Sequence, residues 1–313
     1  MKKKLIVLLT LSIMLLSACD SGKSVSSQNK GQDKTSQTVS EPAVVEKPQF
    51  TKDTYPKIDG STATIPLSDG IAANILGLSD EEASKFIKHN TTHDAYVNLV
   101  KGNADIILVT EPSMDELKIA KDANVDLEIV PVVKEGFVFL VNSNNPIKSL
   151  TTKQVQDIYE GKIKTWKEVG GSDDEIIPFQ RERNSGSQTL MEQIVMKGHT
   201  LMDSPKSIIT SMSGLIDAIA AYDNSEKALG YSVYYYAKQM YNKDTIKLIE
   251  VDGVIPNNKN ISSGKYPFTT GYYAVLKKTT SADANSRKLL KWILGKDGQN
   301  LAEKSGYVPL LVR

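Results

Sequence analysis

The sequence predicts an α/β protein with a second domain inserted into the first. From Tyr55 onward, short apolar runs alternate with helical patterns, which is typical of a sheet flanked by helices. Two strand-like segments, residues 136–146 and 246–258, each run into a polar stretch that contains a proline. We expect the chain to cross between domains at these two segments.

One helix–strand unit is clear in residues 94–110, "DAYVNLVKGNADIILVT". Tyr96, Leu99 and Val100 have the spacing of one helix face, and Gly102 is placed to end that helix. The "ADIILV" that follows is almost continuously apolar, as expected of a strand buried on both faces of a sheet. Units of this kind build α/β proteins.

Further helices are predicted along the chain. Thr151 and Gln154 form a possible capping box at the start of a helix that ends near Gly161. Residues 286–306 carry four apolar side chains on one helical face. No repeat at a fixed period is present in the sequence, so a solenoid is not expected.

The charge balance and the cysteine content exclude several classes of function. Lys and Arg number 38 and Asp and Glu 37, so no broad positive field is available to attract nucleic acid. Cys19 is the only cysteine, which excludes an internal disulfide and a cysteine-rich metal site. The chain has three histidines, His89, His93 and His199, and no cysteine pair to complete a zinc motif with them. We expect no metal and no cofactor.

The N-terminus predicts export and lipid attachment. Three lysines precede an apolar run over residues 5–16, which is too short to span a bilayer and has the pattern of an export signal. The run leads into "LSAC", which resembles the lipobox of bacterial lipoproteins, where the cysteine is lipidated and becomes the mature N-terminus. We predict a signal peptide over residues 1–18 and a lipid anchor at Cys19 on the outer face of the cytoplasmic membrane. The alternative is a simply secreted protein.

The segment that follows predicts a flexible tether over residues 19–50. It is rich in Ser, Gln, Lys and Asp and has few large apolar side chains to offset the entropy of ordering. We expect the folded part to divide into lobe I, residues 51–143 plus 255–313, and an inserted lobe II, residues 144–254. The protein is expected to be a monomer.

The stretch "QRERNSGSQT" concentrates hydrogen-bond donors at the start of a predicted helix. Free backbone N–H groups at a helix N-terminus favour an anion, and Gly186 allows close approach of the backbone. Ser185 and Ser187 add hydroxyls, and Arg181 can present a fork of two charged hydrogen bonds. An ordinary N-cap, Ser185 with Gln188, explains the hydroxyls equally well.

Two other stretches place hydroxyls before helices. "DGSTATIPL" offers Ser61 and Thr62 ahead of a helix that begins near Pro66, and we predict that this turn faces Arg181 across a cleft. "HNTTHDAY" is a third candidate, in which Thr91, Thr92 and His93 precede a helix. For Thr91, Thr92 and Asp94 we favour simple helix capping.

The strand "ADIILV" is followed by "TEPS", which places Thr110 and Glu111 at its carboxyl end. Open α/β sheets bind their ligands at that edge. We predict that both residues contact the ligand, and that Glu111 accepts a hydrogen bond from a ligand that still carries a proton. Such an acceptor would favour a protonated oxyanion over a fully ionised one of the same shape.

Several of these blocks together resemble one family. "IDGSTATIPL", "KGNADIILVTEPS", "LTTKQVQDIYEGKIKTWKEVGG", "RERNSGSQT", "ALGYSVYYYAK" and "KWILGKDGQNLAEKSGYVPL" occur in the order seen in PstS-type substrate-binding proteins of phosphate ABC transporters. The resemblance covers about residues 55–313 and implies the two-lobed type II periplasmic-binding-protein fold, with each lobe a mixed sheet flanked by helices and a two-strand hinge between them.

The resemblance also implies a ligand, a partner and roles for residues. The ligand would be inorganic phosphate or a related tetrahedral oxyanion, delivered to the permease subunits of an ABC transporter. An arginine four residues before a Ser-Gly-Thr/Ser triplet grips phosphate in that family; here it is Arg181. The first-loop hydroxyls match Ser61 and Thr62, and the family's acid most nearly matches Glu111. Arg183 departs from the pattern, because some phosphate binders carry Asp there.

Other functions stay open on the sequence alone. Ser185 or Ser187 beside a histidine would be compatible with a hydrolase, but no G-x-S-x-G elbow is present and no histidine is placed as a base, so we expect no enzyme. A lipoprotein of the same fold with another ligand, or with a sensing or adhesion role, is the remaining alternative.

Overall fold

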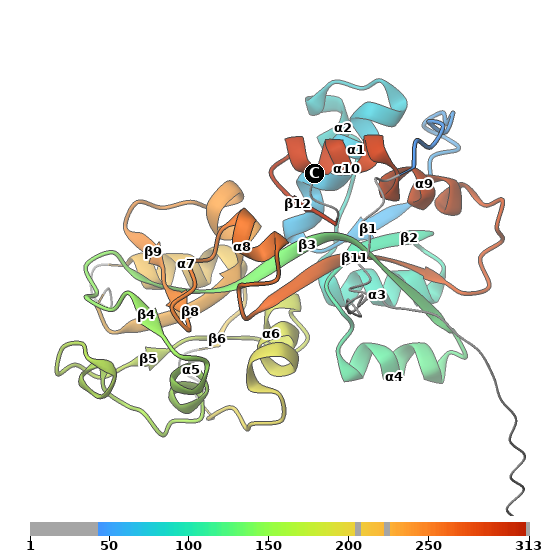
Figure 1. The fold of residues 1–313 in the computed structure, drawn as a ribbon. Coiled ribbons are helices and arrows are strands. Elements are labelled where there is room, and N and C mark those ends of the chain that lie inside the picture. The colour runs from blue at the N-terminus through green and yellow to red at the C-terminus, as the bar shows by residue number, and fades with distance from the viewer. Residues whose placement is uncertain (1–42, 204–207, 222–225, 311–313) are drawn as a thin grey trace, which may run out of the picture. The chain divides into compact units, whose positions relative to one another are not determined.

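The computed structural model describes residues 43–203, 208–221 and 226–310 (Figure 1). These residues belong to one compact unit, Ser40–Arg313. The predicted signal peptide, the lipidation site Cys19 and the predicted tether up to residue 42 lie outside the described residues.

Strands and helices alternate along the chain, as the sequence predicts. The strands are β1 (Ile58–Gly60), β2 (Ile106–Val109), β3 (Leu127–Asn142), β4 (Ser149–Leu150), β5 (Ile177–Pro178), β6 (Gln180–Arg181), β7 (Ile208–Ile209), β8 (Ala228–Val233), β9 (Ile246–Leu248), β10 (Glu250–Val251), β11 (Thr269–Lys277) and β12 (Val308–Pro309). The α-helices are α1 (Ile65–Leu76), α2 (Asp80–Phe86), α3 (Thr92–Lys101), α4 (Met114–Asp122), α5 (Thr152–Tyr159), α6 (Gly186–Leu190), α7 (Met212–Ala220), α8 (Asn258–Ser262), α9 (Asn285–Leu294) and α10 (Lys296–Lys304). Short 3₁₀ turns, η1 (Thr62–Thr64) and η2 (Trp166–Val169), and two π-helical segments, η3 (Met191–Met196) and η6 (Tyr236–Met240), complete the set.

The main sheet is mixed and has the strand order β1-β2-β11-β3-β8-β5, with β9 and β12 also paired to β3. The long strand β3 pairs with β11 up to Gly136 and with β8 from Phe137 onward. Strand β3 is therefore shared by two groups of strands, one around β11 and the other around β8 (Figure 1). We call the elements around β1, β2 and β11 the first lobe, and the elements around β5, β8 and β9, with the small pair β6–β7, the second lobe.

Strand β2 shows why the sequence pattern predicts a strand covered on both faces. All four of its residues are 0% exposed. Ile106 and Leu108 pack into the large core, whereas Ile107 and Val109 pack into a second cluster with α3 residues such as Leu99. Because side chains alternate between the two faces of a strand, a continuous apolar run is needed when both faces are buried.

The start of the folded part differs from the prediction. The tether was predicted to extend to residue 50, but residues 43–50 lie on the fold. The carbonyl of Ala43 accepts a hydrogen bond from the backbone N–H of Lys296 at 3.0 Å, and Val45 packs against the core. Phe50 meets Tyr55 edge to face with ring centroids 6.0 Å apart. These apolar side chains bury enough surface to order the segment.

Helix boundaries agree with the local signals in part. The capping box of Thr151 and Gln154 is present, and the helix that it starts ends at Tyr159. The helix predicted over residues 286–306 is interrupted at Gly295, which separates α9 from α10. The helix predicted to follow "QRERNSGSQT" begins at Gly186 and turns into the π-helix η3 at Met191.

A buried carboxyl group lies where β3 passes from one lobe to the other. Glu135 is 2% exposed and pairs in register with Thr270 of β11, immediately before β3 begins to pair with β8. Its Oε1 accepts hydrogen bonds from the backbone N–H of Gly136 (2.8 Å) and of Tyr235 (3.1 Å). Burial outweighs these hydrogen bonds and raises the pKa of Glu135 to about 7.

Candidate functional site

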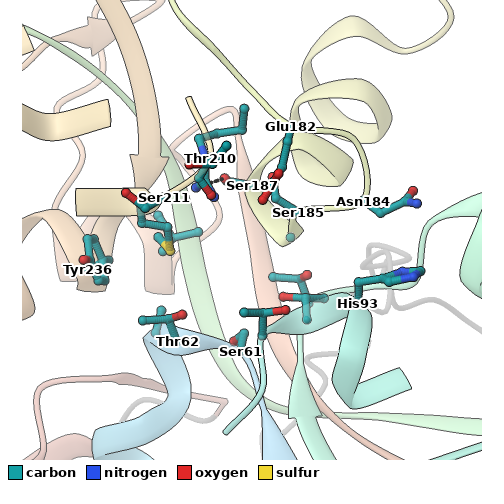
Figure 2. Close-up of a pocket in the computed structure, with 18 of the residues that line it drawn as sticks. Ser61, Thr62, His93, Glu182, Asn184, Ser185, Ser187, Thr210, Ser211 and Tyr236 are labelled. Atoms are coloured by element: carbon teal, nitrogen blue, oxygen red, sulfur yellow. Dashed lines mark hydrogen bonds between the residues drawn. The ribbon is translucent and has the colours of Figure 1, made fainter. Parts of the chain in front are cut away.

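A cavity of about 450 Å³ is lined by residues of both lobes. Figure 2 shows Ser61, Thr62 and His93 on one side of the cavity and Ser185, Ser187, Thr210, Ser211 and Tyr236 on the other. All the predicted ligand-binding residues except Glu111 are among those that line it, namely Ser61, Thr62, Thr110, Arg181, Ser185, Gly186 and Ser187. The structure thus brings together side chains that are far apart in the sequence.

The first-lobe wall is built from the ends of two neighbouring strands. Strands β1 and β2 pair in parallel, so their carboxyl ends lie side by side, and Ser61 directly follows β1 as Thr110 follows β2. Thr110 is 3% exposed, and its Oγ1 has no hydrogen-bond partner within the described residues. A buried hydroxyl that lacks a protein partner and lines a cavity is available to a ligand.

Buried polar groups hold this wall in position. The carboxylate of Asp59 accepts hydrogen bonds from the backbone and side-chain N–H groups of Asn90 (2.7 and 2.9 Å) and from the side chain of Asn98 (2.8 Å). Nδ1 of His89 lies 3.0 Å from the carbonyl oxygen of Ser61. These contacts connect the turn after β1 to the turn before α3. The sequence analysis did not identify Asp59, Asn90 or His89 as supports of the site.

The turn before α3 is strained where it lines the cavity. Thr91 has φ 86° and ψ 166°, a region that is populated almost only by glycine. Its side chain makes no capping hydrogen bond to α3, so the prediction of simple helix capping is wrong for this residue. Backbone strain of this kind is concentrated at binding sites. We therefore count Thr91 and Thr92, which also lines the cavity, as part of the site.

On the second-lobe side, Arg181 is held from several directions. Its Nε donates to the carbonyl of Ile209 at 2.9 Å, one Nη donates to the carbonyl of Thr210 at 2.9 Å, and the other donates to Oγ of Ser187 at 3.2 Å. Its backbone N–H donates to the hydroxyl of Tyr231 at 2.8 Å. Three of the five N–H groups of a guanidinium are thus used, and two remain for a ligand.

The charge of Arg181 is buried without a counter-ion. The residue is 7% exposed, and in the part of the chain that the structure describes its guanidinium forms no ion pair with a carboxylate. Burial lowers the pKa of Arg181, although the group stays charged at any physiological pH. A buried charge without a partner is unfavourable, and an anion in the cavity would offset this cost.

The Ser-Gly-Ser turn brings the second lobe close to the first. Ser185 caps α6 by accepting a hydrogen bond from the backbone N–H of Gln188, as the sequence predicts. Gly186 lies so near the opposite wall that a Cβ atom on it would be 2.7 Å from Oγ1 of Thr92 and 2.8 Å from Oγ1 of Thr110. The turn therefore caps α6, which was one of its two expected roles, and it also lines the cavity, where its other expected role of anion binding would be carried out.

The structure corrects the position of Glu111. This residue does not line the cavity; its Oε1 accepts a hydrogen bond from the hydroxyl of Tyr273 at 2.7 Å. Thr110 and Glu111 are consecutive at the end of an extended strand, so their side chains leave the backbone in different directions. The carboxylates that do line the cavity are those of Asp94 and Glu182.

Sequence reasoning missed part of the second-lobe wall. Ser211, Ser213 and Tyr236 line the cavity, and Ser211 also caps α7 by accepting from the backbone N–H of Gly214 at 2.9 Å. The signal was present: "SMSGLIDAIA" has the same pattern of hydroxyls before a helix that singled out "NSGSQT". His93 also lines the cavity, and its Nδ1 lies 3.2 Å from the buried carboxylate of Glu116.

The described residues contain neither a cluster of metal ligands nor a membrane-spanning helix. Within residues 43–203, 208–221 and 226–310, no group of three or more His, Cys, Asp or Glu side chains is placed to hold a metal ion. No helix in the same residues is both long and apolar enough to cross a bilayer. The polar groups of the cavity include several hydroxyls and the buried guanidinium of Arg181, and the carboxylates of Asp94 and Glu182 also line it. Hydroxyls and a guanidinium are donors suited to an oxyanion.

Comparison with known proteins places the fold. Residues 51–296 match the family model of the PBP superfamily domain. A substrate-binding protein from Clostridium perfringens, assigned to a phosphate ABC transporter and solved with bound phosphate, superposes with a TM-score of 0.64 at 24% identity, over 84% of this chain and all of that one. An ABC-type phosphate transport receptor from Vibrio cholerae superposes with a TM-score of 0.60 at 20% identity, over 83% of this chain and 99% of that one. The two-lobed type II periplasmic-binding-protein fold is thereby confirmed.

Sequence relatives agree with the structural match. The phosphate-binding protein PstS of Bacillus subtilis is 26% identical over 99% of this chain and 95% of its own length. The PstS protein of Staphylococcus epidermidis strain RP62A is 25% identical over 80% of this chain and 78% of its own length. Both relatives are named as phosphate-binding proteins. The chain belongs to the PBP superfamily and is a distant relative of the PstS phosphate-binding proteins.

Proposed function

We propose that the protein captures inorganic phosphate, or a closely related tetrahedral oxyanion, in the cavity between its lobes. The observation that carries this proposal is the buried guanidinium of Arg181, which has no ion-pair partner in the described chain and faces hydroxyls from both lobes. Charge-assisted hydrogen bonds are strong in such a dry cavity, so one arginine with several neutral donors can hold a multiply charged anion. The names of the relatives support phosphate as the leading ligand.

We extend the proposal to transport. The loaded protein would dock on the membrane permease of an ABC transporter. The name of the relative from Clostridium perfringens, a substrate-binding protein of a phosphate ABC transporter, supports this role. A lipid on Cys19 would hold it at the outer face of the cytoplasmic membrane, and the lobes 51–143 plus 255–313 and 144–254 would close about a hinge at β3 and the crossing near residues 246–258. Domain closure of this kind occurs on the microsecond-to-millisecond scale.

Calorimetry of the purified full-length protein against phosphate, sulfate, molybdate and tungstate tests the ligand. We expect saturable binding of phosphate at one site. The absence of heat with phosphate and binding of another of these anions would reassign the ligand, and the absence of binding with all of them would refute an oxyanion site. A strong preference for phosphate over sulfate would point to Asp94 or Glu182 as the acceptor of the ligand proton, because Glu111 lies outside the cavity.

The replacement Gly186→Ala is expected to weaken phosphate binding by about 1–3 kcal/mol. The new Cβ would lie within 2.8 Å of two buried hydroxyl oxygens of the first lobe, those of Thr92 and Thr110, and would hold the walls apart. Gly70→Ala is the matched control, because a Cβ in that helix meets nothing closer than 3.5 Å. Calorimetry of both variants checks the prediction, and an unchanged affinity in Gly186→Ala would show that the two walls need not approach so closely.

A further inference from the structure

Polar contacts bridge the two lobes beside the cavity. Nη2 of Arg183, in the second lobe, lies 2.8 Å from Oδ1 of Asp115 on α4 of the first lobe. Nδ2 of Asn184 donates to Oδ2 of the same carboxylate at 3.0 Å. Both Arg183 and Asn184 line the cavity, and Figure 2 shows Asn184 on the second-lobe wall, across from His93. We call Asp115, Arg183 and Asn184 the clasp.

The local structure presents each member of the clasp. Ser113 and Glu116 form a capping box that fixes the first turn of α4, and Asp115 lies in that turn, where the positive end of the helix dipole favours a carboxylate. Asn184 has φ 65°, a left-handed conformation that asparagine tolerates and that turns the chain between Arg183 and the cap residue Ser185.

Further observations indicate that the contacts of the clasp are formed at neutral pH. The side-chain amide of Gln193 donates to the carbonyl of Pro112 at 2.9 Å, so a third hydrogen bond joins the same two segments. The hydrogen bond from Asn184, followed by the hydrogen bond and charge of Arg183, lowers the pKa of Asp115. The carboxylate is therefore ionised, and both of its oxygens are used by the opposite lobe.

We propose that the clasp sets the fraction of molecules in which the cleft is closed, and through it the affinity for the oxyanion. The inference rests on the proposed function. Arg183 then acts as a positioning residue that binds Asp115, whereas Arg181 binds the ligand. Apparent affinity is the intrinsic affinity multiplied by the population of the binding-competent state, so a contact present only in the closed state strengthens binding without touching the ligand.

The clasp and a simple electrostatic model predict opposite effects of one substitution. Asp115 is a negative charge close to a site for an anion, so Coulomb's law alone predicts that Asp115→Asn strengthens binding. If Asp115 instead holds the cleft closed, the same substitution weakens binding. The Arg183 side chain is 78% exposed, so the pair is weak, and we expect a loss of affinity of about three- to tenfold.

A double-substitution cycle measured by phosphate calorimetry on the full chain tests the clasp. The proteins are wild type, Asp115→Asn, Arg183→Gln and the double variant. We expect Arg183→Gln to weaken binding in the wild-type background and to have little further effect in the Asp115→Asn background. Asp122→Asn is the matched control, because it removes the same charge from the far end of α4, where Asp122 pairs with Lys118. Thermal unfolding shows that each variant is folded.

The outcomes separate the clasp from the proposed function. Affinity that is unchanged or stronger in Asp115→Asn overturns the clasp and leaves the oxyanion site intact. An equal effect of Arg183→Gln in both backgrounds also overturns it, since Arg183 would then act on the ligand directly. A wild-type protein that binds no oxyanion overturns the proposed function and the clasp together.

Discussion

Replacing Arg181 with alanine will weaken oxyanion binding by at least about 3 kcal/mol, which is more than about 100-fold in affinity. The guanidinium is 7% exposed and is the one side chain of the cavity that combines burial, a fixed positive charge and free N–H groups. Without it, an anion in the cavity would be desolvated without a compensating charge. Calorimetry with phosphate measures the loss directly.

Two further variants make the result specific to the guanidinium. Arg181→Lys keeps the charge but loses the fork of N–H groups, so we expect an intermediate affinity. Arg287→Ala removes an arginine that pairs with Glu128 at 2.6 Å and does not line the cavity, and we expect no change. Thermal unfolding of Arg181→Ala checks that the loss of bonds to Ile209 and Thr210 has not unfolded the second lobe. If a folded Arg181→Ala variant binds as tightly as wild type, Arg181 is not the anchor.

The titration of Glu135 will lower the free energy of unfolding as the pH rises from about 4.5 to about 7. Its pKa is raised from 4.5 to about 7 by burial, so the folded protein holds a proton in this window that the unfolded chain releases. The stabilisation is fully present below pH 4.5 and is lost as the pH rises through 7, and it amounts to about 3 kcal/mol. Glu135→Gln imitates the protonated form and removes this dependence.

The measurement is the difference in unfolding free energy between Glu135→Gln and wild type at pH 5 and at pH 8. The difference cancels the contributions of titrating groups that both proteins share. One of them is His89, whose pKa is lowered by burial, so that its contribution to stability rises with pH whereas that of Glu135 falls. We expect the unfolding free energy of Glu135→Gln, relative to that of wild type, to be higher at pH 8 than at pH 5. Glu128→Gln, on the same strand β3, serves as the control, and equal differences at both pH values would show that Glu135 does not titrate between them.

Much of the fold and part of the site could be predicted because the signals are local. The helix-capping box at Thr151, the strand at Ile106–Val109 and the cap at Ser185 each depend on residues a few positions apart. The link between Arg181 and Ser187 is also local, since six positions separate them. Short-range spacing is sufficient to place such groups on the same turn.

Contacts that depend on tertiary packing could not be predicted. Thr110 and Glu111 were both expected to face the ligand because they follow β2, but consecutive side chains of an extended chain point to different sides, and only Thr110 lines the cavity. The bridge between Asp115 and Arg183 depends on how the lobes meet, which no short stretch of sequence encodes. The strained Thr91 lies beside Asn90, which is held by the distant Asp59. The packed segment 43–50 was missed because its few apolar side chains are separated by polar ones.

The shared strand β3 limits how this protein can be taken apart or recombined. Val138 and Leu140 are fully buried among partners of the second lobe, while Val132 and Val133 are equally buried earlier in the same strand. A fragment that contained only one lobe would lose half of the partners of β3. The unpaired backbone groups and apolar side chains of that strand would then be exposed to water or would pair with another chain. Evolution and protein engineering can therefore exchange the turns around the cavity far more readily than either half of the molecule.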